Sequence, residues 1–244
     1  MKFGYDIIIK SNLNDYLKNY KNLFYWDNRL LDLNTETYDK NIAFFGCSLT
    51  YGHGVENNET YPHQVHEKSG GKYNCLNFGV PGGSLDLMSK IYNKVMKELD
   101  IDLVIMQWPD LYRRMYFHDG VYYGMYAWRP AETREEKFRS RAFTLLSNDE
   151  YSVSRNLPNL QVLNSFNPVL NLVNFGWHCG MGPMPSKEIF NFYGIDNMLD
   201  FSTPSPSEIE FSIPVGAEGY GHPNGKWYEK YVTEYLYEEI EKLL

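Results

Sequence analysis

Short apolar segments that alternate with amphipathic helical segments restrict the fold of this sequence more than any other feature. Four segments have the apolar composition of buried strands: 41–46, 73–79, 102–108 and 168–178. Three segments have apolar residues at helical spacing: 59–70, 84–100 and 225–244. This alternation predicts a three-layer α/β/α fold, in which helices cover both faces of a parallel sheet of four or five strands.

Two further segments stand outside the alternation. Residues 1–40 are polar and aromatic, and their apolar spacing predicts a helical N-terminal extension packed on a main domain of residues 41–244. Residues 110–150 are rich in Tyr, Arg and Gly, and they predict an insertion over one end of the sheet. Such an insertion either carries substrate contacts or is a decorated surface loop.

The charge and hydropathy of the chain exclude several classes of function. The 244 residues carry a formal net charge of −8, which disfavours a general nucleic-acid binder because phosphates require clustered Lys and Arg. No apolar run approaches the roughly 20 residues needed to span a bilayer. The N-terminus lacks the apolar core and cleavage site of a signal peptide, so we expect a protein that is cytoplasmic where it is made, without a membrane partner. An oligomeric state cannot be predicted.

The metal-binding residue types show no metal motif. The three cysteines have an odd count and no metal-ligand spacing: Cys47, Cys75 and Cys179. Three histidines are close in sequence, but no further ligand has a convincing spacing: His53, His63 and His66. We therefore expect solvated surface histidines, no metal site and no cofactor.

Glycine-rich turns follow the first two predicted strands and precede the last predicted helix. The first, 46–52, reads Gly-Cys-Ser-Leu-Thr-Tyr-Gly, and the second, 77–84, reads Asn-Phe-Gly-Val-Pro-Gly-Gly-Ser. The third, 221–224, reads Gly-His-Pro-Asn. Ligands of open parallel sheets bind beyond the carboxyl ends of the strands, which is where the first two turns must lie. A histidine on the third turn could reach the same edge.

Taken in order, these three turns resemble the SGNH, or GDSL-like, hydrolase family. The first block of that family is Gly-Asp-Ser-x-Thr/Ser, which residues 46–50 match except that Cys47 replaces the Asp. The second block has a Gly that Gly79 matches, and the last block, Asp-x-x-His, often continues with Pro-Asn, as in 222–224. The resemblance covers about 41–109 and 215–244, and it implies a flavodoxin-like fold of the SGNH-hydrolase type.

The resemblance also implies roles for individual residues. Ser48 would be the nucleophile, and His222 would be the base that a serine hydroxyl requires. The backbone N–H groups of Ser48 and Gly79 would stabilise the oxyanion. The third family block, Gly-x-Asn-Asp, is missing, and Gln107 is the nearest side chain that could replace its Asn as a donor.

The acid of the expected triad is also missing from its usual place. Gly219 stands three residues before His222, where the family has Asp, and Glu218 is the adjacent carboxylate. Either Glu218 orients His222, or the site is a Ser–His dyad whose imidazole is held by a backbone carbonyl.

These residues lead to a functional hypothesis with open alternatives. We expect a serine esterase that acts on a small-molecule or carbohydrate acyl ester. An O-acetylated carbohydrate would suit a cleft lined by the insertion's aromatic residues: Tyr122, Tyr123 and Trp128. The alternatives are an O-acyltransferase on the same fold, a non-catalytic module that binds a glycan or protein, a Cys47 nucleophile, and a plain turn of a nucleotide-binding fold.

Overall fold

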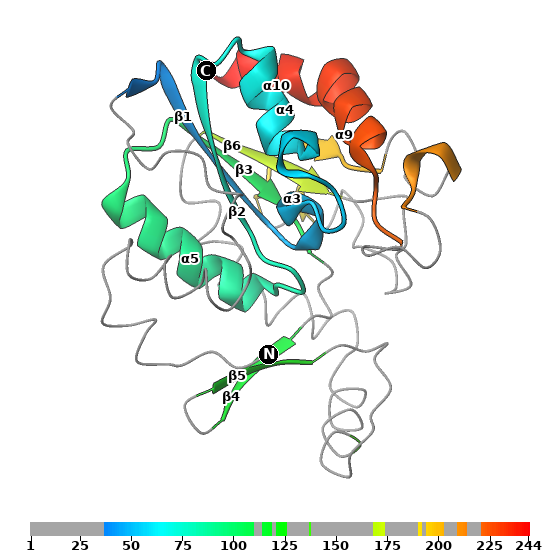
Figure 1. Cartoon of the computed structure of the whole chain (residues 1–244). Helices are drawn as coiled ribbons and strands as arrows, with labels where there is room; N and C mark the ends of the chain where they lie inside the picture. Colours follow the sequence, from blue (N-terminus) through cyan, green and yellow to red (C-terminus); the bar gives the residue numbers. More distant parts are fainter. Residues whose placement is uncertain are drawn as a thin grey trace.

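Five parallel strands form the sheet at the centre of the computed structural model (Figure 1). The structure describes residues 37–109, 114–118, 121–125, 137, 168–173, 190–191, 194–202, 209–213 and 221–244. Within these residues the sheet has the order β2-β1-β3-β6-β7. Its strands are β1 (Lys40–Gly46), β2 (Tyr73–Gly79), β3 (Leu103–Gln107), β6 (Val169–Val173) and β7 (Met198–Asp200). The predicted parallel sheet is therefore confirmed.

The register of strand β1, which lies between β2 and β3, brings two of the glycine-rich turns together. Gly46 at the end of β1 pairs with Gly79 at the end of β2, so the segments that follow both strands leave the sheet side by side. The N–H of Val80 donates to the carbonyl of Gly46 over 3.0 Å and extends this pairing past the last strand residues. The two turns therefore share the carboxyl edge of the sheet.

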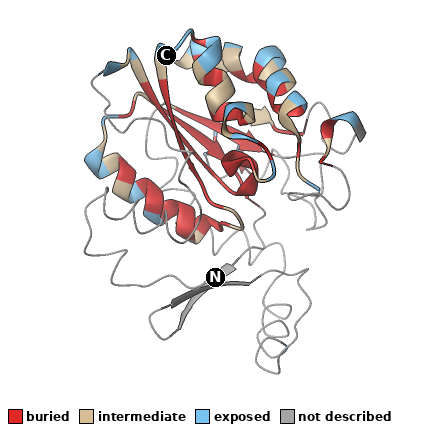
Figure 2. Cartoon of the chain, in the orientation of Figure 1, coloured by how far each residue is buried: buried red, intermediate tan, exposed pale blue. Residues whose placement is uncertain are grey.

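Helices cover both faces of the sheet, as the alternating pattern predicts. Helix α5 (Leu85–Glu98) lies on one face, and α4 (Tyr61–Lys68), α9 (Gly225–Tyr231) and α10 (Tyr237–Leu243) lie on the other (Figure 1). Along β1, Ala43 and Phe45 pack in the core beneath α5, whereas Ile42 and Phe44 pack in the core of the opposite face. Figure 2 shows that the strands β1, β2, β3 and β6 are buried along most of their length.

The predicted elements differ from the observed ones mainly at their ends. The last helix, predicted as continuous, contains a five-residue π segment, Val232–Leu236, between α9 and α10. Strand β7 was not predicted, because it has three residues, all half-buried, within a stretch that reads as a short helix and loop. The predicted strand 168–178 is described only to residue 173.

A two-stranded antiparallel sheet lies within the predicted insertion. Its strands are β4 (Arg114–His118) and β5 (Val121–Met125), and Tyr122 and Tyr123 belong to β5. Trp128 and residues 1–36 lie outside the described residues, so the N-terminal extension and the insertion boundaries stay predictions. Among the residues that the structure describes, no helix has the length and apolar character to cross a bilayer.

One short helix is seated on the end of β2. Helix α3 (Ser48–Tyr51) follows β1 directly, and its backbone lies so close to Gly79 that this position cannot carry a side chain. A Cβ at Gly79 would lie 2.3 Å from the backbone nitrogen of Tyr51. The glycine is thus required by the packing of α3 against β2.

We expect Gly79→Ala to lower the free energy of unfolding by roughly 3 kcal/mol, because the added methyl group meets backbone atoms that cannot rotate away. Gly70→Ala is the control. Gly70 has open space around it, so only its positive φ of 69° opposes a side chain. We expect Gly70→Ala to lower the free energy of unfolding by about 1 kcal/mol. Denaturant titration of the two variants measures the difference, and equal losses would contradict the proposed close packing of α3.

Candidate functional site

The turn after β1 presents Ser48 at the carboxyl edge of the sheet. Gly46 ends the strand, and the chain enters α3 at once, so Ser48 is the first residue of this helix. Gly52 ends the helix in the left-handed conformation, with φ of 75°, which favours glycine. The N–H groups of Gly52 and His53 both donate to the carbonyl of Ser48 over 3.0 Å.

Groups from two distant parts of the chain bind two further carbonyls of α3. The last carbonyls of a helix have no partner within the helix, and leaving them buried and unpaired is costly. Here the Tyr228 hydroxyl of α9 donates to the carbonyl of Leu49 over 2.8 Å. The Asn77 amide of β2 donates to the carbonyl of Thr50 over 2.9 Å. Helix α3 is therefore held by both β2 and α9.

A buried polar cluster supports the turn from the strand side. Gln107 Oε1 accepts hydrogen bonds from the Cys47 N–H at 3.0 Å and from the Cys47 thiol at 3.2 Å. It also accepts from the Thr50 hydroxyl at 3.3 Å, and this hydroxyl is in turn 2.8 Å from the Tyr61 hydroxyl. Burial raises the pKa of Tyr61 well above its usual value, so this hydroxyl stays neutral. The cluster connects β3 and α4 to the turn.

The segment around His222 is fixed by its backbone on both sides. The N–H of Ile213 donates to the carbonyl of His222 over 2.9 Å, and the N–H of Asn224 donates to the carbonyl of Phe211 over 2.8 Å. Asn224 also caps α9, because its side-chain oxygen accepts from the N–H of Trp227 over 3.2 Å. These bonds place the imidazole just before α9, at the same edge as α3.

Ser48 and His222 meet at this edge. The Nε2 of His222 lies 2.8 Å from the Oγ of Ser48, although the two residues are 174 positions apart in the chain. Ser48 is 7% exposed, and His222 is half-buried. A hydroxyl within hydrogen-bond reach of an imidazole is the arrangement that allows proton transfer from a serine nucleophile.

Cys47 and Ser48 point to different surroundings. The Cys47 side chain belongs to the core on the α4 and α9 face, is 2% exposed and donates to Gln107. Its neighbour Ser48 is the one that contacts His222. Of these two adjacent side chains, Ser48 is therefore the one that the structure places beside an imidazole. Cys75 lies in the same core, and burial raises the pKa of its thiol, which keeps it protonated.

Two predicted oxyanion donors are already engaged by the fold. The N–H of Gly79 donates to Asn77 Oδ1 over 3.0 Å, so an oxyanion would have to share or take over this donor. The Gln107 amide nitrogen donates to the carbonyl of Trp108 over 2.6 Å, while its oxygen faces Cys47. Gln107 is 1% exposed, and these contacts favour support of the turn over donation to substrate.

Glu218, the predicted acid, lies outside the described residues, so its role stays a prediction. Among the described residues, no group of three or more His, Cys, Asp or Glu side chains could hold a metal ion.

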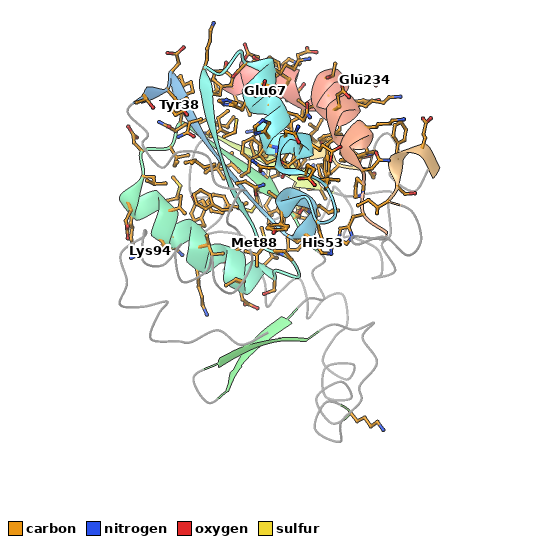
Figure 3. All side chains as sticks on the ribbon, in the orientation of Figure 1. Tyr38, His53, Glu67, Met88, Lys94 and Glu234 are labelled. Atoms are coloured by element: carbon orange, nitrogen blue, oxygen red, sulfur yellow. The ribbon has the colours of Figure 1, made fainter. Side chains whose placement is uncertain are left out.

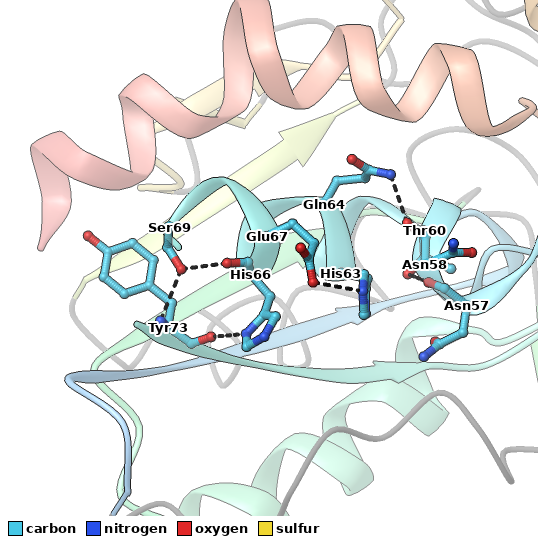
Figure 4. Close-up of polar contacts among 9 residues, drawn as sticks. All are labelled: Asn57, Asn58, Thr60, His63, Gln64, His66, Glu67, Ser69 and Tyr73. Atoms are coloured by element: carbon cyan, nitrogen blue, oxygen red, sulfur yellow. Dashed lines mark hydrogen bonds and ion pairs between the residues drawn. The ribbon is translucent and has the colours of Figure 1, made fainter. Parts of the chain in front are cut away.

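None of the three histidines in the N-terminal half is the solvated surface residue that we expected. On α4, His63 Nε2 is 3.3 Å from a carboxylate oxygen of Glu67, and His66 Nδ1 is 2.7 Å from the carbonyl of Tyr73 (Figure 4). Both side chains are half-buried, and their partners lie on α4 and at the start of β2. His53 has a different neighbour, because its ring centroid lies 5.1 Å from that of His222, edge to face. It therefore belongs to the candidate site.

Several residues that build the site had no assigned role in the sequence. Asn77 and Tyr228 bind the carbonyls of α3, and Thr50 and Tyr61 join the cluster beneath it. Asn77 is the first residue of the second glycine-rich turn, which is only a weak indication that it supports the site. Tyr228 is one of 21 tyrosines, and nothing in its local sequence distinguishes it.

Comparisons with known proteins find similarity at the level of structure only. No family model matches the chain, and no curated protein sequence matches it. One similar solved structure is a two-domain esterase active on acetylated mannans, with 14% identity and a TM-score of 0.46 over 84% of this chain. The match spans about half, 48%, of that esterase.

Two further solved structures are similar at comparably low sequence identity. A candidate lipolytic protein of the G-D-S-L family from Desulfitobacterium hafniense has 13% identity and a TM-score of 0.37, over 84% of this chain and all of its own. A salicylyl acyltransferase from a tetracycline biosynthetic pathway has 13% identity and a TM-score of 0.46, over 86% of this chain and 55% of its own.

We expect Gln107→Leu to lower the free energy of unfolding by about 2 kcal/mol, because the buried N–H of Cys47 and the carbonyl of Trp108 lose their partner. Asn93→Leu is a suitable control, since Asn93 is exposed and its amide donates to the helical carbonyl of Ser89. Thermal and denaturant unfolding of both variants measure the effect. Undiminished stability of Gln107→Leu combined with a large loss of turnover would instead favour a direct role in catalysis.

Proposed function

We propose that this protein is a serine esterase in which Ser48 is the nucleophile and His222 is the general base. The observation that carries the proposal is the 2.8 Å separation of Ser48 Oγ and His222 Nε2. The location of the two residues adds support, because both stand at the carboxyl edge of a parallel sheet, where open α/β folds bind their ligands.

The first chemical step is acylation of the enzyme. His222 Nε2 takes the proton from Ser48 Oγ as this oxygen forms a bond with the carbonyl carbon of the ester. The carbonyl oxygen becomes an anion in the tetrahedral intermediate. When the carbon–oxygen bond to the alcohol breaks, His222 gives its proton to the departing oxygen, and an acyl-Ser48 ester remains.

The second step returns the enzyme to its starting state. A water molecule gives a proton to His222 and attacks the acyl carbon, and the bond to Ser48 Oγ breaks as His222 returns the proton to that oxygen. The products are a carboxylic acid and the free serine hydroxyl. An alcohol that takes the place of water would make the same chain an O-acyltransferase.

The oxyanion requires donors that are fixed before the reaction begins. Ser48 starts α3, and the first N–H groups of a helix have no acceptor within the helix, so the Ser48 N–H is the first candidate donor. Gly79 is the second, although its N–H now donates to Asn77. Gln107 contributes indirectly, because it fixes the Cys47 N–H one residue before the nucleophile.

The proposed substrate is an acyl ester of a small molecule or carbohydrate, with an O-acetylated carbohydrate as the favoured class. Support for a carbohydrate comes from the aromatic composition of the hairpin strand β5, which includes Tyr122 and Tyr123. Neither a cofactor nor a metal ion takes part in the mechanism that we propose.

We expect Ser48→Ala to lower the turnover of p-nitrophenyl acetate by at least about 10⁴-fold, because no other group can form the acyl-enzyme. Cys47→Ala is the matched control at the adjacent position, and it should keep most of the turnover since its backbone N–H still reaches Gln107. A fluorophosphonate probe should label wild type and Cys47→Ala but not Ser48→Ala.

The reverse pattern, with Cys47→Ala inactive and Ser48→Ala active, would contradict the proposed nucleophile. Absence of both turnover and labelling in the wild type would instead favour a non-catalytic binding module.

Glu218 is proposed to orient His222 and to stabilise the imidazolium that forms during each step. We expect Glu218→Gln to lower kcat/KM for p-nitrophenyl acetate by at least tenfold, since the amide cannot stabilise the positive ring. Glu210→Gln, which changes an exposed glutamate near the same edge, is the control. If kcat/KM is unchanged in Glu218→Gln across the pH range, the site is a Ser–His dyad.

A further inference from the structure

His53 is fixed next to the catalytic pair by the same turn that carries Ser48. It follows Gly52 and precedes Gly54, and both glycines have positive φ, 75° and 86°. Its N–H donates to the carbonyl of Ser48 over 3.0 Å. Figure 3 shows His53 at the end of the sheet where α3 lies, and its side chain is half-buried.

The ring of His53 packs directly on the ring of His222. The two centroids are 5.1 Å apart, and the ring planes form an angle of 72°. His53 therefore has a fixed position relative to both members of the proposed pair. Its half-buried imidazole leaves part of the ring open to a bound molecule, and an imidazole can both donate and accept hydrogen bonds.

The proposed mechanism determines which part of a substrate must lie near His222. The alcohol oxygen receives its proton from His222 Nε2, so it must come within about 2.6–3.2 Å of this atom. The atoms attached to that oxygen then lie within a few ångströms of the imidazole. The His53 ring, which contacts the His222 ring, is thereby close enough to meet the alcohol part of a substrate. The acyl chain is a separate substituent of the carbonyl carbon and extends away from the alcohol oxygen.

We propose that His53 is a specificity-determining residue that contacts the alcohol part of the ester and selects alcohols with a further hydroxyl group beside the ester oxygen. The inference rests on the proposed esterase function and extends it. The substrate class that it names is the esters of polyhydroxy alcohols, including sugars. The same position receives an acceptor alcohol during acyl transfer, because that step is the reverse of alcohol departure.

A second role would also explain the ring contact. His53 could serve only as packing that holds the His222 ring. Loss of such packing would lower the rate for every ester by the same factor, whereas loss of an alcohol contact changes the rates for different alcohols by different factors. His53→Phe separates the two roles, because it keeps an aromatic ring beside His222 and removes the ring nitrogens.

The experiment compares two substrate pairs. Ethyl acetate and glycerol monoacetate share an acyl group and differ in the alcohol, whereas glycerol monoacetate and glycerol monopropionate share the alcohol. We expect His53→Phe to lower kcat/KM for glycerol monoacetate relative to ethyl acetate about three- to tenfold, the effect of one neutral hydrogen bond. The ratio of acetate to propionate should not change, because it reports on the acyl group.

Two further variants and one further readout make the result specific. His53→Gln keeps a side chain that can hydrogen-bond and should recover part of the preference for glycerol esters. His63→Phe, on α4 and paired with Glu67, is the control histidine and should leave both ratios unchanged. With p-nitrophenyl acetate as donor and added glycerol, His53→Phe should lower the ratio of glycerol monoacetate to acetate formed by a similar factor, because this ratio compares acyl transfer to glycerol with acyl transfer to water.

The outcomes distinguish this inference from the function on which it rests. If the wild type is active and loses activity in Ser48→Ala, but His53→Phe keeps the wild-type preference between the two acetates, the inference is wrong. The same holds if the variant changes the acyl ratio as strongly as the alcohol ratio. If the wild type hydrolyses none of these esters and is not labelled at Ser48, the esterase proposal fails, and the inference fails with it.

Discussion

The hydrogen bond from the Tyr228 hydroxyl to the carbonyl of Leu49 joins the two halves of the candidate site. Tyr228 belongs to α9, which follows His222 closely, and Leu49 follows Ser48 in α3. The bond is buried, so water does not compete for either group. The separation of Ser48 and His222 is thus set by a rigid frame around them, which is the kind of preorganisation that catalysis requires.

Two residues that differ from the SGNH sequence pattern, which this chain resembles, are compatible with each other in the structure. Cys47 stands where the family has Asp, and both its N–H and its thiol donate to Gln107 Oε1. An aspartate at this position would bring a second acceptor, with a negative charge, against the amide oxygen in a buried site. Rotating the amide would relieve that contact, but the Cys47 N–H would then lose its acceptor. A neutral donor at position 47 therefore suits a glutamine at position 107.

The sequence allowed the sheet and the two residues Ser48 and His222 to be predicted, because apolar runs and glycine-rich turns are visible in short stretches of sequence. The apolar run before Gly46 fixed β1, and the order of the three glycine-rich turns singled out Ser48 and His222, which the structure brings together. The sequence could not reveal partners that depend on packing. Strand β7 is too short to have a pattern, and the contact of His53 with His222 joins residues far apart in the chain.

A covalent acyl-enzyme is the central claim of this account, and its position in the chain can be measured directly. The measurement is rapid acid quench of the protein during turnover of p-nitrophenyl acetate, followed by proteolysis and mass spectrometry of the peptide that contains residues 47 and 48. We predict an acetyl group on the Ser48 oxygen that disappears once the substrate is consumed. An acetyl group on Cys47, or turnover without any covalent adduct when hydrolysis of the adduct has been slowed, would contradict the account.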